Sequence, residues 1–166
     1  VHRNNTFLLY KKGWQGINID IHSFSIDLFN HLRPNDLNYN FAVSDKNEIL
    51  KMYYQKELSQ LSTIDNAYAK KVFQGHIKEK KIQALTLNEI LKISQIEKKI
   101  DLLDIDVEGA DFRVLQGLSF DKFRPELICI EIHEENFKES EIYKFLDSIN
   151  YELIWSGVFS YIFKSK

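Results

Sequence analysis

The sequence predicts an α/β domain built on a mostly parallel sheet that ends in an antiparallel hairpin. A chain of 166 residues is long enough for one compact domain and too short for two ordinary ones. Apolar segments of strand length alternate with segments of helical period, as they do when helices cover a parallel sheet. The last two strand segments are separated only by a tight turn, which favours an antiparallel pair. We therefore treat residues 1–166 as a single domain.

The first half of the chain contains clear start and stop signals. Thr6 is a candidate N-cap for a short helix through FLLYKK, and Gly13 is placed to end it in a left-handed conformation. An amphipathic helix over about 23–32 is stopped by Pro34. We expect strands at about residues 16–21, 38–43 and 49–54, the last two flanking a turn at 44–47.

The second half continues the alternation after an insertion. Residues 55–79 have no clear period and are expected to form a surface insertion, part loop and part helix. Thr86 and Glu89 have capping-box spacing and predict a helix that reaches about Ser94. The remaining expected elements are strands at 81–85, 100–105 and 127–132, helices at 111–117 and 140–149, and closing strands at 151–156 and 158–164.

Charge and composition exclude several function classes. The formal net charge is −2 with acids and bases intermixed, so no broad basic surface is expected to bind nucleic acid. No apolar run of about 18 residues and no basic-then-apolar leader is present, so we expect no membrane span and a cytoplasmic protein. The single cysteine, Cys129, lies in the apolar run LICIEI and is expected to be a buried, unreactive thiol.

Polar side chains follow four of the expected strands. Ligands of open α/β sheets bind beyond the carboxyl ends of the strands, so these side chains are the candidate site residues. In chain order they are Asp20 after GINI, Ser44 and Asp45 after NYNFAV, Asp106, Glu108 and Gly109 after IDLLDI, and Glu131 and His133 at the end of LICIEI.

Asp20 has two interpretations. An acid at this strand end can accept hydrogen bonds from both ribose hydroxyls of an adenosine cofactor. It can equally serve as a favourable charge at the N-terminus of the helix that starts near Ser23.

The segment LLDIDVEGADFRVLQGL is the most specific in the sequence. Gly109 lets the backbone turn tightly into the next helix. Asp106 and Glu108 precede it either as site acids or as turn residues that favour a helix N-terminus. Asp104 lies inside an apolar strand and needs a partner to justify its burial.

His133 follows Glu131 by two positions, so both side chains should project to one face of an extended strand. The pKa range of histidine suits a general base, and a structural role is the alternative. A set of aromatic residues is expected to pack in the core or at sheet edges and not to form a sugar-stacking platform. These residues are Tyr53, Tyr54, Trp155, Phe159 and Tyr161.

Four segments, in this order and spacing, resemble the FkbM-type methyltransferases: NNTFLLYKKGWQGINID, AVSDKNEI, LDIDVEGADFRVLQGL and FRPELICIEIHE. The resemblance runs from about Asn4 to Tyr151. It implies a Rossmann-like class I methyltransferase fold with S-adenosylmethionine as cofactor. It also implies an acceptor hydroxyl on a saccharide, glycolipid or natural product.

The resemblance further implies roles for individual residues. An alcohol is a weak nucleophile and needs a base, which adds His133 to the candidates. By position, Asp20 resembles the ribose-binding acid, Ser44 and Asp45 the adenine-side contact, and Asp106 and Glu108 the acidic motif of the methyl-transfer site.

Three alternatives remain open. A metal-assisted reaction could use Asp106, Glu108, Glu131 and His133, but these residues have no recognised ligand spacing and we expect no metal. A nucleotide-sugar glycosyltransferase could use Asp104 and Asp106 as an Asp-x-Asp metal site. A non-catalytic binding module is the third alternative.

One feature departs from the family. Such domains carry a first strand and a glycine-rich loop before the helix that we place at Thr6, and this sequence has neither. We expect them upstream of Val1, which would make the domain N-terminally incomplete. The strands at 17–20 and 100–105 should then be about 9 to 10 Å apart, and direct pairing between them would favour the non-catalytic alternative.

Overall fold

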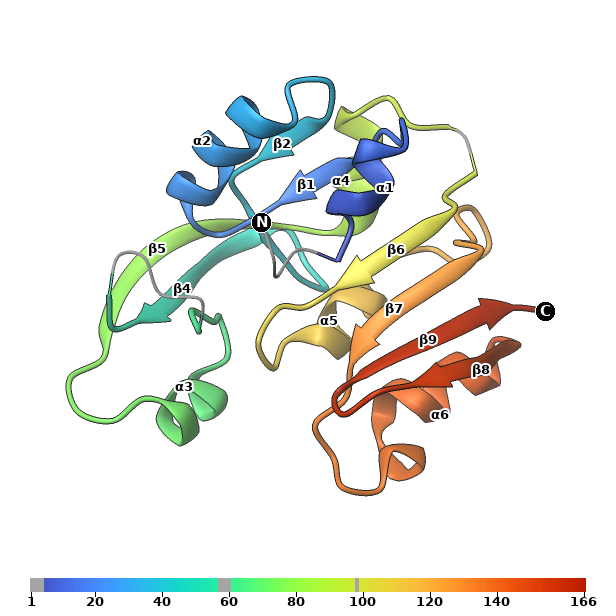
Figure 1. Cartoon of the computed structure of the whole chain (residues 1–166). Coiled ribbons are helices and arrows are strands. Elements are labelled where there is room, and N and C mark those ends of the chain that lie inside the picture. The colour runs from blue at the N-terminus through green and yellow to red at the C-terminus, as the bar shows by residue number, and fades with distance from the viewer. Residues whose placement is uncertain (1–4, 57–60, 98) are drawn as a thin grey trace.

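The computed structural model describes residues 5–56, 61–97 and 99–166 and has an α/β architecture (Figure 1). The α-helices are α1 (Phe7–Lys11), α2 (Ser23–Leu32), α3 (Asn66–Val72), α4 (Leu87–Ile93), α5 (Asp111–Gln116) and α6 (Glu141–Ser148). The strands are β1 (Ile17–Ile19), β2 (Leu37–Tyr39), β3 (Ala42–Val43), β4 (Glu48–Tyr54), β5 (Lys78–Leu85), β6 (Leu102–Ile105), β7 (Leu127–Glu131), β8 (Tyr151–Ser156) and β9 (Ser160–Ser165). Helices and strands alternate as expected.

The strands form three sheets among the described residues. β1 and β2 are a parallel pair, β5 lies between β3 and β4, and the largest sheet has the order β6-β7-β9-β8. β6 and β7 are parallel, whereas β9 runs antiparallel to both β7 and β8, which confirms the closing hairpin. β1 and β6 belong to different sheets, so they do not pair directly.

The prediction of one continuous parallel sheet is therefore wrong in its extent. The run at 38–43 is two short strands, β2 and β3, and each belongs to a different sheet. The chain breaks between them at Asn40, whose side-chain amide donates to the carbonyl of Asp20 at 2.9 Å. An apolar run with strand propensity does not reveal such a break, nor the contact to residue 20 that accompanies it.

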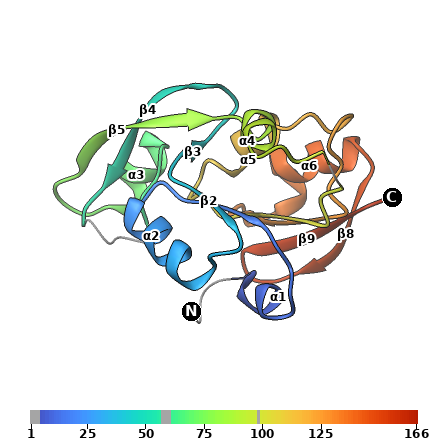
Figure 2. The same ribbon diagram turned by 90° about the horizontal axis from the view of Figure 1, so that it is seen from above.

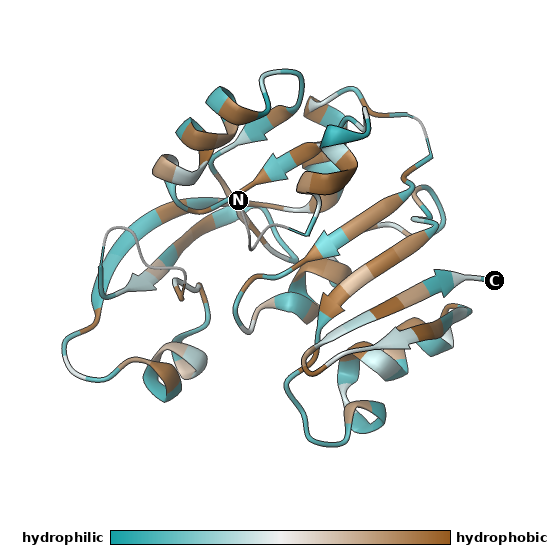
Figure 3. Cartoon of the chain, viewed as in Figure 1, coloured by the Kyte–Doolittle hydropathy of each residue, from teal (hydrophilic) through white to brown (hydrophobic). Residues whose placement is uncertain are grey.

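The core lies on one face of the four-stranded sheet. Figure 2 shows α5 and α6 on one side of this sheet and α1 on the other. Ile128 and Ile130 of β7 are fully buried in the same cluster as Leu115 of α5 and Leu146 of α6. Hydrophobic residues run along β7, as expected for a strand inside a sheet, and along the neighbouring edge strand β6 (Figure 3). The polar ends of these strands are therefore held on a rigid support.

The sequence signals for helix ends are mostly confirmed. The Thr86 hydroxyl accepts from the Glu89 N–H at 3.2 Å, and Gly13 has a φ of +90° after α1. Thr6 does occupy the N-cap position of α1, but its side chain makes no cap hydrogen bond. Its hydroxyl instead accepts from Arg33 Nη1 at 2.9 Å.

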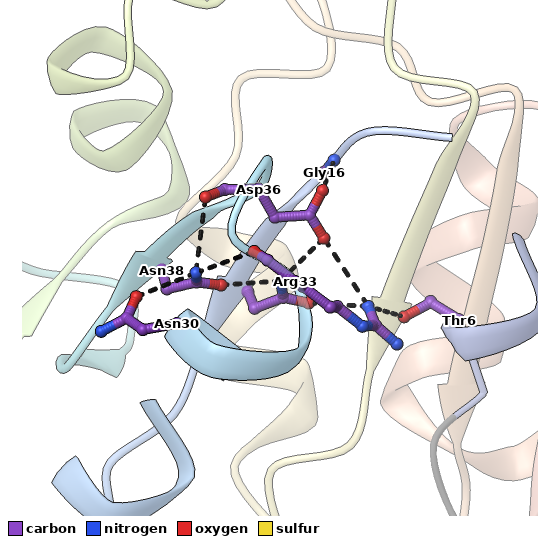
Figure 4. Close-up of polar contacts among 7 residues, drawn as sticks. Thr6, Gly16, Asn30, Arg33, Asp36 and Asn38 are labelled. Carbon is purple, nitrogen blue, oxygen red and sulfur yellow. Dashed lines mark hydrogen bonds and ion pairs between the residues drawn. The ribbon is translucent and has the colours of Figure 1, made fainter. Parts of the chain in front are cut away.

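A buried polar network joins α1, β1, α2 and β2 around Arg33 (Figure 4). Arg33 is 3% exposed, donates to Thr6 and Asn18, and lies 3.8 Å from Asp36. Asp36 also accepts from the Gly16 main chain and from Asn18, each at 3.0 Å. Burial lowers the pKa of Arg33, and Asp36 opposes this shift. The network fixes the start of β1, and with it the direction in which β1 leads to Asp20.

No helix within residues 5–56, 61–97 and 99–166 is long and apolar enough to cross a membrane.

Candidate functional site

A group of acidic side chains gathers where β6 and β7 end. β1, β6 and β7 point the same way in Figure 1, so their carboxyl ends face one side of the domain. Asp106 and Glu131 and the charged residues that shift their pKa values form one cluster of six residues. They are Asp104, Asp106, Glu108, Asp111, Glu131 and His133. We call these six residues the acid cluster. Asp20 and Asp45, which follow β1 and β3, are not among the neighbours that shift these two acids.

The turn after β6 is held by Asp111, a residue that the sequence analysis did not single out. Asp111 is 4% exposed, and its carboxylate accepts from the N–H groups of Val107 at 3.2 Å and Gly109 at 3.1 Å. The turn-stabilising role that we considered for Asp106 and Glu108 thus falls to Asp111. Its position in the first turn of α5 was the available signal.

Two consecutive residues of this turn have left-handed backbones. Glu108 has a φ of +54° and Gly109 a φ of +92°. Gly109 is also tightly packed, because a Cβ there would lie 2.7 Å from Cδ2 of Tyr68. A left-handed glutamate is uncommon and persists only where its surroundings hold it.

The surroundings of Glu108 come from the insertion between β4 and β5. The Tyr68 hydroxyl of α3 donates to Glu108 Oε2 at 2.5 Å, and the Thr63 hydroxyl donates to the Glu108 carbonyl at 2.7 Å. From the sequence alone, residues 55–79 are expected to be a surface insertion, part loop and part helix. The helical part is confirmed as α3, but nothing in the local pattern indicates that it contacts the turn after β6.

The acid cluster raises the pKa of two of its carboxyl groups toward neutrality. Burial raises the pKa of Glu131 to about 7, and the charge of Asp106 is the next cause. Asp106 is exposed to solvent, but loss of hydration beside the protein surface raises its pKa to about 6, and the charge of Glu108 is the next cause. His133 opposes the shift of Asp106, and its Nε2 lies 3.3 Å from Glu131 Oε2. The predicted proximity of Glu131 and His133 is confirmed.

Asp104 and Cys129 lie at paired positions of β6 and β7. Asp104 accepts from the side-chain amide of Asn5 at 3.3 Å, which supplies the partner that its burial requires. Burial, and then the charge of Asp104, raise the pKa of Cys129 to about 12. Cys129 is half-buried, and its thiol stays protonated as expected of an unreactive cysteine.

Ser44 and Asp45 form a second polar site after β3. Ser44 is fully buried, and its hydroxyl donates to Asp45 Oδ1 at 3.0 Å. Arg113 of α5 forms an ion pair with the same oxygen at 2.7 Å. The side chain of Ser44 is thus directed to Asp45, and Asp45 is linked to the helix that follows the acid cluster.

Asp20 lies half-buried just beyond β1. Its Oδ1 accepts from the main-chain N–H of His22 at 2.7 Å, next to the start of α2. The contact matches the helix N-terminal interpretation, and it engages one of the two carboxylate oxygens.

Aromatic rings lie beside the acid cluster. The ring of His133 is 6.0 Å from that of Tyr68 and 5.3 Å from that of Phe159. Tyr53 and Tyr161 are buried as expected, but Trp155 is 52% exposed and Phe159 is 51% exposed. These last two residues are therefore not in the core: Trp155 lies on the edge strand β8, and Phe159 lies at the turn of the closing hairpin.

No group of three or more histidine, cysteine, aspartate or glutamate side chains within the described ranges is arranged to hold a metal ion. The members of the acid cluster are near neighbours, yet they do not converge on one point as metal ligands must.

Comparison with known proteins decides the family. Over residues 2–153 the chain matches the family described as the methyltransferase FkbM domain. The chain belongs to the FkbM methyltransferase family. No curated protein and no solved structure matched the chain.

An FkbM methyltransferase uses S-adenosylmethionine as its methyl donor, so the chain is an S-adenosylmethionine-dependent enzyme. The glycosyltransferase and the non-catalytic module are therefore set aside. One residue fits the adenosine part of this cofactor. Asp20 is a half-buried carboxylate beyond the carboxyl end of β1, and adenosine cofactors bind beyond such strand ends.

Proposed function

We propose that this FkbM methyltransferase transfers a methyl group to a hydroxyl oxygen of a saccharide, glycolipid or natural product. The observation that carries the proposal is the gathering of carboxyl groups beyond the paired ends of β6 and β7, where His133 Nε2 lies 3.3 Å from Glu131 Oε2. Burial there raises the pKa of Asp106 to about 6 and that of Glu131 to about 7. A general base works best when its pKa lies near the operating pH.

The reaction requires one proton acceptor. As the acceptor oxygen forms its bond to the methyl carbon and the carbon–sulfur bond breaks, the hydroxyl proton must leave. Bound S-adenosylmethionine supplies an electrophilic methyl group on a sulfonium sulfur. We assign the proton to Asp106, whose charge acts on Glu131 and is acted on by His133, and these two residues are themselves in contact at 3.3 Å. Because these groups interact, the acid cluster takes the proton as a unit.

Cofactor binding is assigned to the two sites outside the acid cluster. Asp20 keeps one carboxylate oxygen on the His22 N–H, and we assign the other to the ribose hydroxyls. We assign Asp45 to the adenine side, with Ser44 as its buried support. The Arg113 ion pair then connects cofactor binding to α5, whose N-terminus carries the acidic turn.

The exposed aromatic residues support an acceptor with a ring. Phe159 is exposed and lies next to His133, so an acceptor whose hydroxyl reaches the acid cluster would meet an aromatic face. Apolar faces of sugar rings pack on aromatic side chains, while carboxylates accept hydrogen bonds from their hydroxyls. The acceptor class in the proposal rests on this combination.

The test measures transfer of a labelled methyl group from S-adenosylmethionine to a panel of methyl glycosides, glycolipids and phenols. Asp106→Asn should lower turnover by roughly a hundredfold while changing cofactor affinity by less than about threefold. His133→Gln, assayed in parallel, distinguishes a shared base from Asp106 acting alone.

Glu134→Gln is the matched control, because Glu134 is an exposed acid next to His133 that is not among the charges that shift the pKa of Asp106 or Glu131. It should leave turnover unchanged. Full turnover by Asp106→Asn on a methylated acceptor would remove the catalytic assignment. Methylation of phenols and of no glycoside or glycolipid would exclude the saccharide and glycolipid acceptors and leave natural products.

A further inference from the structure

Tyr68 makes two contacts with consecutive residues of the acidic turn. Its hydroxyl donates to Glu108 at 2.5 Å, and its ring packs so closely on Gly109 that a Cβ there would lie 2.8 Å from Tyr68 Cγ. Burial, and then the hydrogen bond to Glu108, raise the pKa of Tyr68 far above its usual range. Tyr68 therefore stays protonated near neutral pH and acts as a hydrogen-bond donor.

Tyr68 is itself held by a chain of hydrogen bonds that begins at β4. Thr63 exchanges two main-chain hydrogen bonds with Tyr53, at 2.8 and 3.1 Å. The Thr63 hydroxyl accepts from the Asp65 N–H at 2.9 Å, and Asp65 caps α3 by accepting from the Tyr68 N–H at 2.7 Å. Each link is short and local, so the main chain at Tyr68 is held against β4.

Glu108 needs such support because its backbone is left-handed, a conformation that a glutamate rarely adopts. Thr63 fixes its carbonyl and Tyr68 fixes its carboxylate, so both contacts come from residues 61–72. The charge of Glu108 is in turn one of the charges that act on Asp106 and Glu131.

We propose that Tyr68 is a positioning residue of the methyl-transfer site, which holds the Glu108 carboxylate against Asp106 and Glu131 and makes residues 61–72 a working part of that site. The proposal deepens the function proposed above and rests on it for its catalytic meaning. The charged and titratable groups that face Glu108 come from α3, β6, β7 and the start of α5. They are Tyr68, Asp104, Asp106, Asp111, Glu131 and His133.

The test uses Tyr68→Phe, which keeps the ring on Gly109 and removes only the hydroxyl. The side-chain carboxyl carbon signals of Asp106 and Glu131 are followed by NMR as the pH is varied. Without its donor, the Glu108 carboxylate should turn toward solvent, and its repulsion of the other carboxylates should fall. The titration midpoints of Asp106 and Glu131 should then move to lower pH by at least about half a unit.

Three comparison variants make the result specific. Glu108→Gln should lower the same two midpoints, and the double variant Tyr68→Phe/Glu108→Gln should show no shift beyond that of Glu108→Gln alone. Tyr54→Phe removes a hydroxyl from β4 in the same part of the fold and should leave both midpoints unchanged. A thermal melt of each variant checks that the fold is retained.

The kinetic counterpart uses whichever glycoside the wild-type enzyme methylates. Tyr68→Phe should lower kcat about tenfold and move the acidic limb of the pH profile to lower pH, with KM for S-adenosylmethionine within about twofold of wild type. If Tyr68 had a purely structural role, Tyr68→Phe would instead lower kcat by the same factor at every pH, and the acidic limb of the pH profile would stay where it is.

Unchanged midpoints in Tyr68→Phe, or additive shifts in the double variant, would overturn the positioning role. The titration needs no acceptor, so this failure is separate from that of the proposed function. If Asp106→Asn leaves methyl transfer intact, the catalytic assignment of Asp106 fails and the catalytic meaning of Tyr68 fails with it, whatever the titration gives.

Discussion

Arg113 binds a single carboxylate oxygen of Asp45 through two of its nitrogens. Nε lies 2.8 Å and Nη2 lies 2.7 Å from Asp45 Oδ1. Burial acts to raise the pKa of Asp45, but the hydrogen bonds from Arg113 and Ser44 outweigh it and lower the pKa. The loop after β3 and the helix after the acidic turn are thus held together by an ion pair, which joins the two halves of the proposed site.

The same loop and helix meet a second time, at Gly117. A Cβ on Gly117 would lie 2.4 Å from the carbonyl oxygen of Ser44. Gly117→Ala should therefore destabilise the domain by about 1 to 3 kcal/mol, because main chain must move to make room. Urea unfolding measures the loss. Gly16→Ala is the control, since nothing lies within 4 Å of a Cβ there, and it should cost less than about 0.5 kcal/mol. Equal stability of the two variants would contradict the close approach.

Asp20→Asn separates the two interpretations of Asp20. The amide oxygen can still accept from the His22 N–H, so the start of α2 should be preserved and the melting temperature should change little. The charge and one acceptor oxygen are lost, and binding of S-adenosylmethionine should weaken at least about tenfold. Calorimetric titration measures the affinity. A lower melting temperature with unchanged affinity would leave Asp20 as a helix-start residue alone.

The acid cluster should make the ligand-free protein less stable as the pH rises. Glu131 has an ordinary pKa of 4.5 when unfolded and about 7 when folded. Between these values the native state keeps a proton that the unfolded chain has released, so the stabilisation present at low pH is lost as the pH rises through about 7. The melting temperature should fall between about pH 5 and about pH 8, and Glu131→Gln should flatten that fall. If the melting temperature of Glu131→Gln fell with pH as steeply as that of the wild type, the raised pKa of Glu131 would be contradicted.

Removing only the cation of the Arg33–Asp36 ion pair should markedly lower the free energy of unfolding. The two side chains are 4% and 2% exposed, so Arg33→Met leaves a buried carboxylate without its cation. The loss of stability should be about 3 to 5 kcal/mol. Lys51→Met breaks the exposed ion pair with Glu79 and should leave the free energy of unfolding nearly unchanged. Denaturant midpoints of the two variants give the comparison, and a small loss at Arg33 would mean that water reaches Asp36.

The sequence predicted the helices, strands and turns better than it predicted which distant segments contact one another. The Thr86 cap, the left-handed Gly13 and the closing hairpin depend on neighbouring residues, and local chemistry was enough to place them. The break between β2 and β3 lies at Asn40, which reaches Asp20 in a contact that no local pattern encodes.

In the candidate site, too, residues marked by their local position were predicted, and residues whose role depends on distant contacts were not. Asp106 and His133 were found because they follow buried strands, and the structure brings them into one cluster. Tyr68 was missed because it reaches Glu108 across 40 residues of chain. Asp111 was missed because its role depends on the backbone of the turn, whose amides point at its carboxylate only after Glu108 and Gly109 take left-handed conformations.

The division into three sheets also determines how the molecule opens. β1 and β2 have three residues each, and two strands of that length cannot persist alone in water. Amide hydrogens of Ile17–Ile19 should therefore exchange with solvent through a local opening, well before those of β7 at the centre of the buried sheet. Since Asp20 follows β1 directly, cofactor binding there should close that opening and slow the exchange. The least protected strands of the ligand-free domain would then report whether the cofactor is bound.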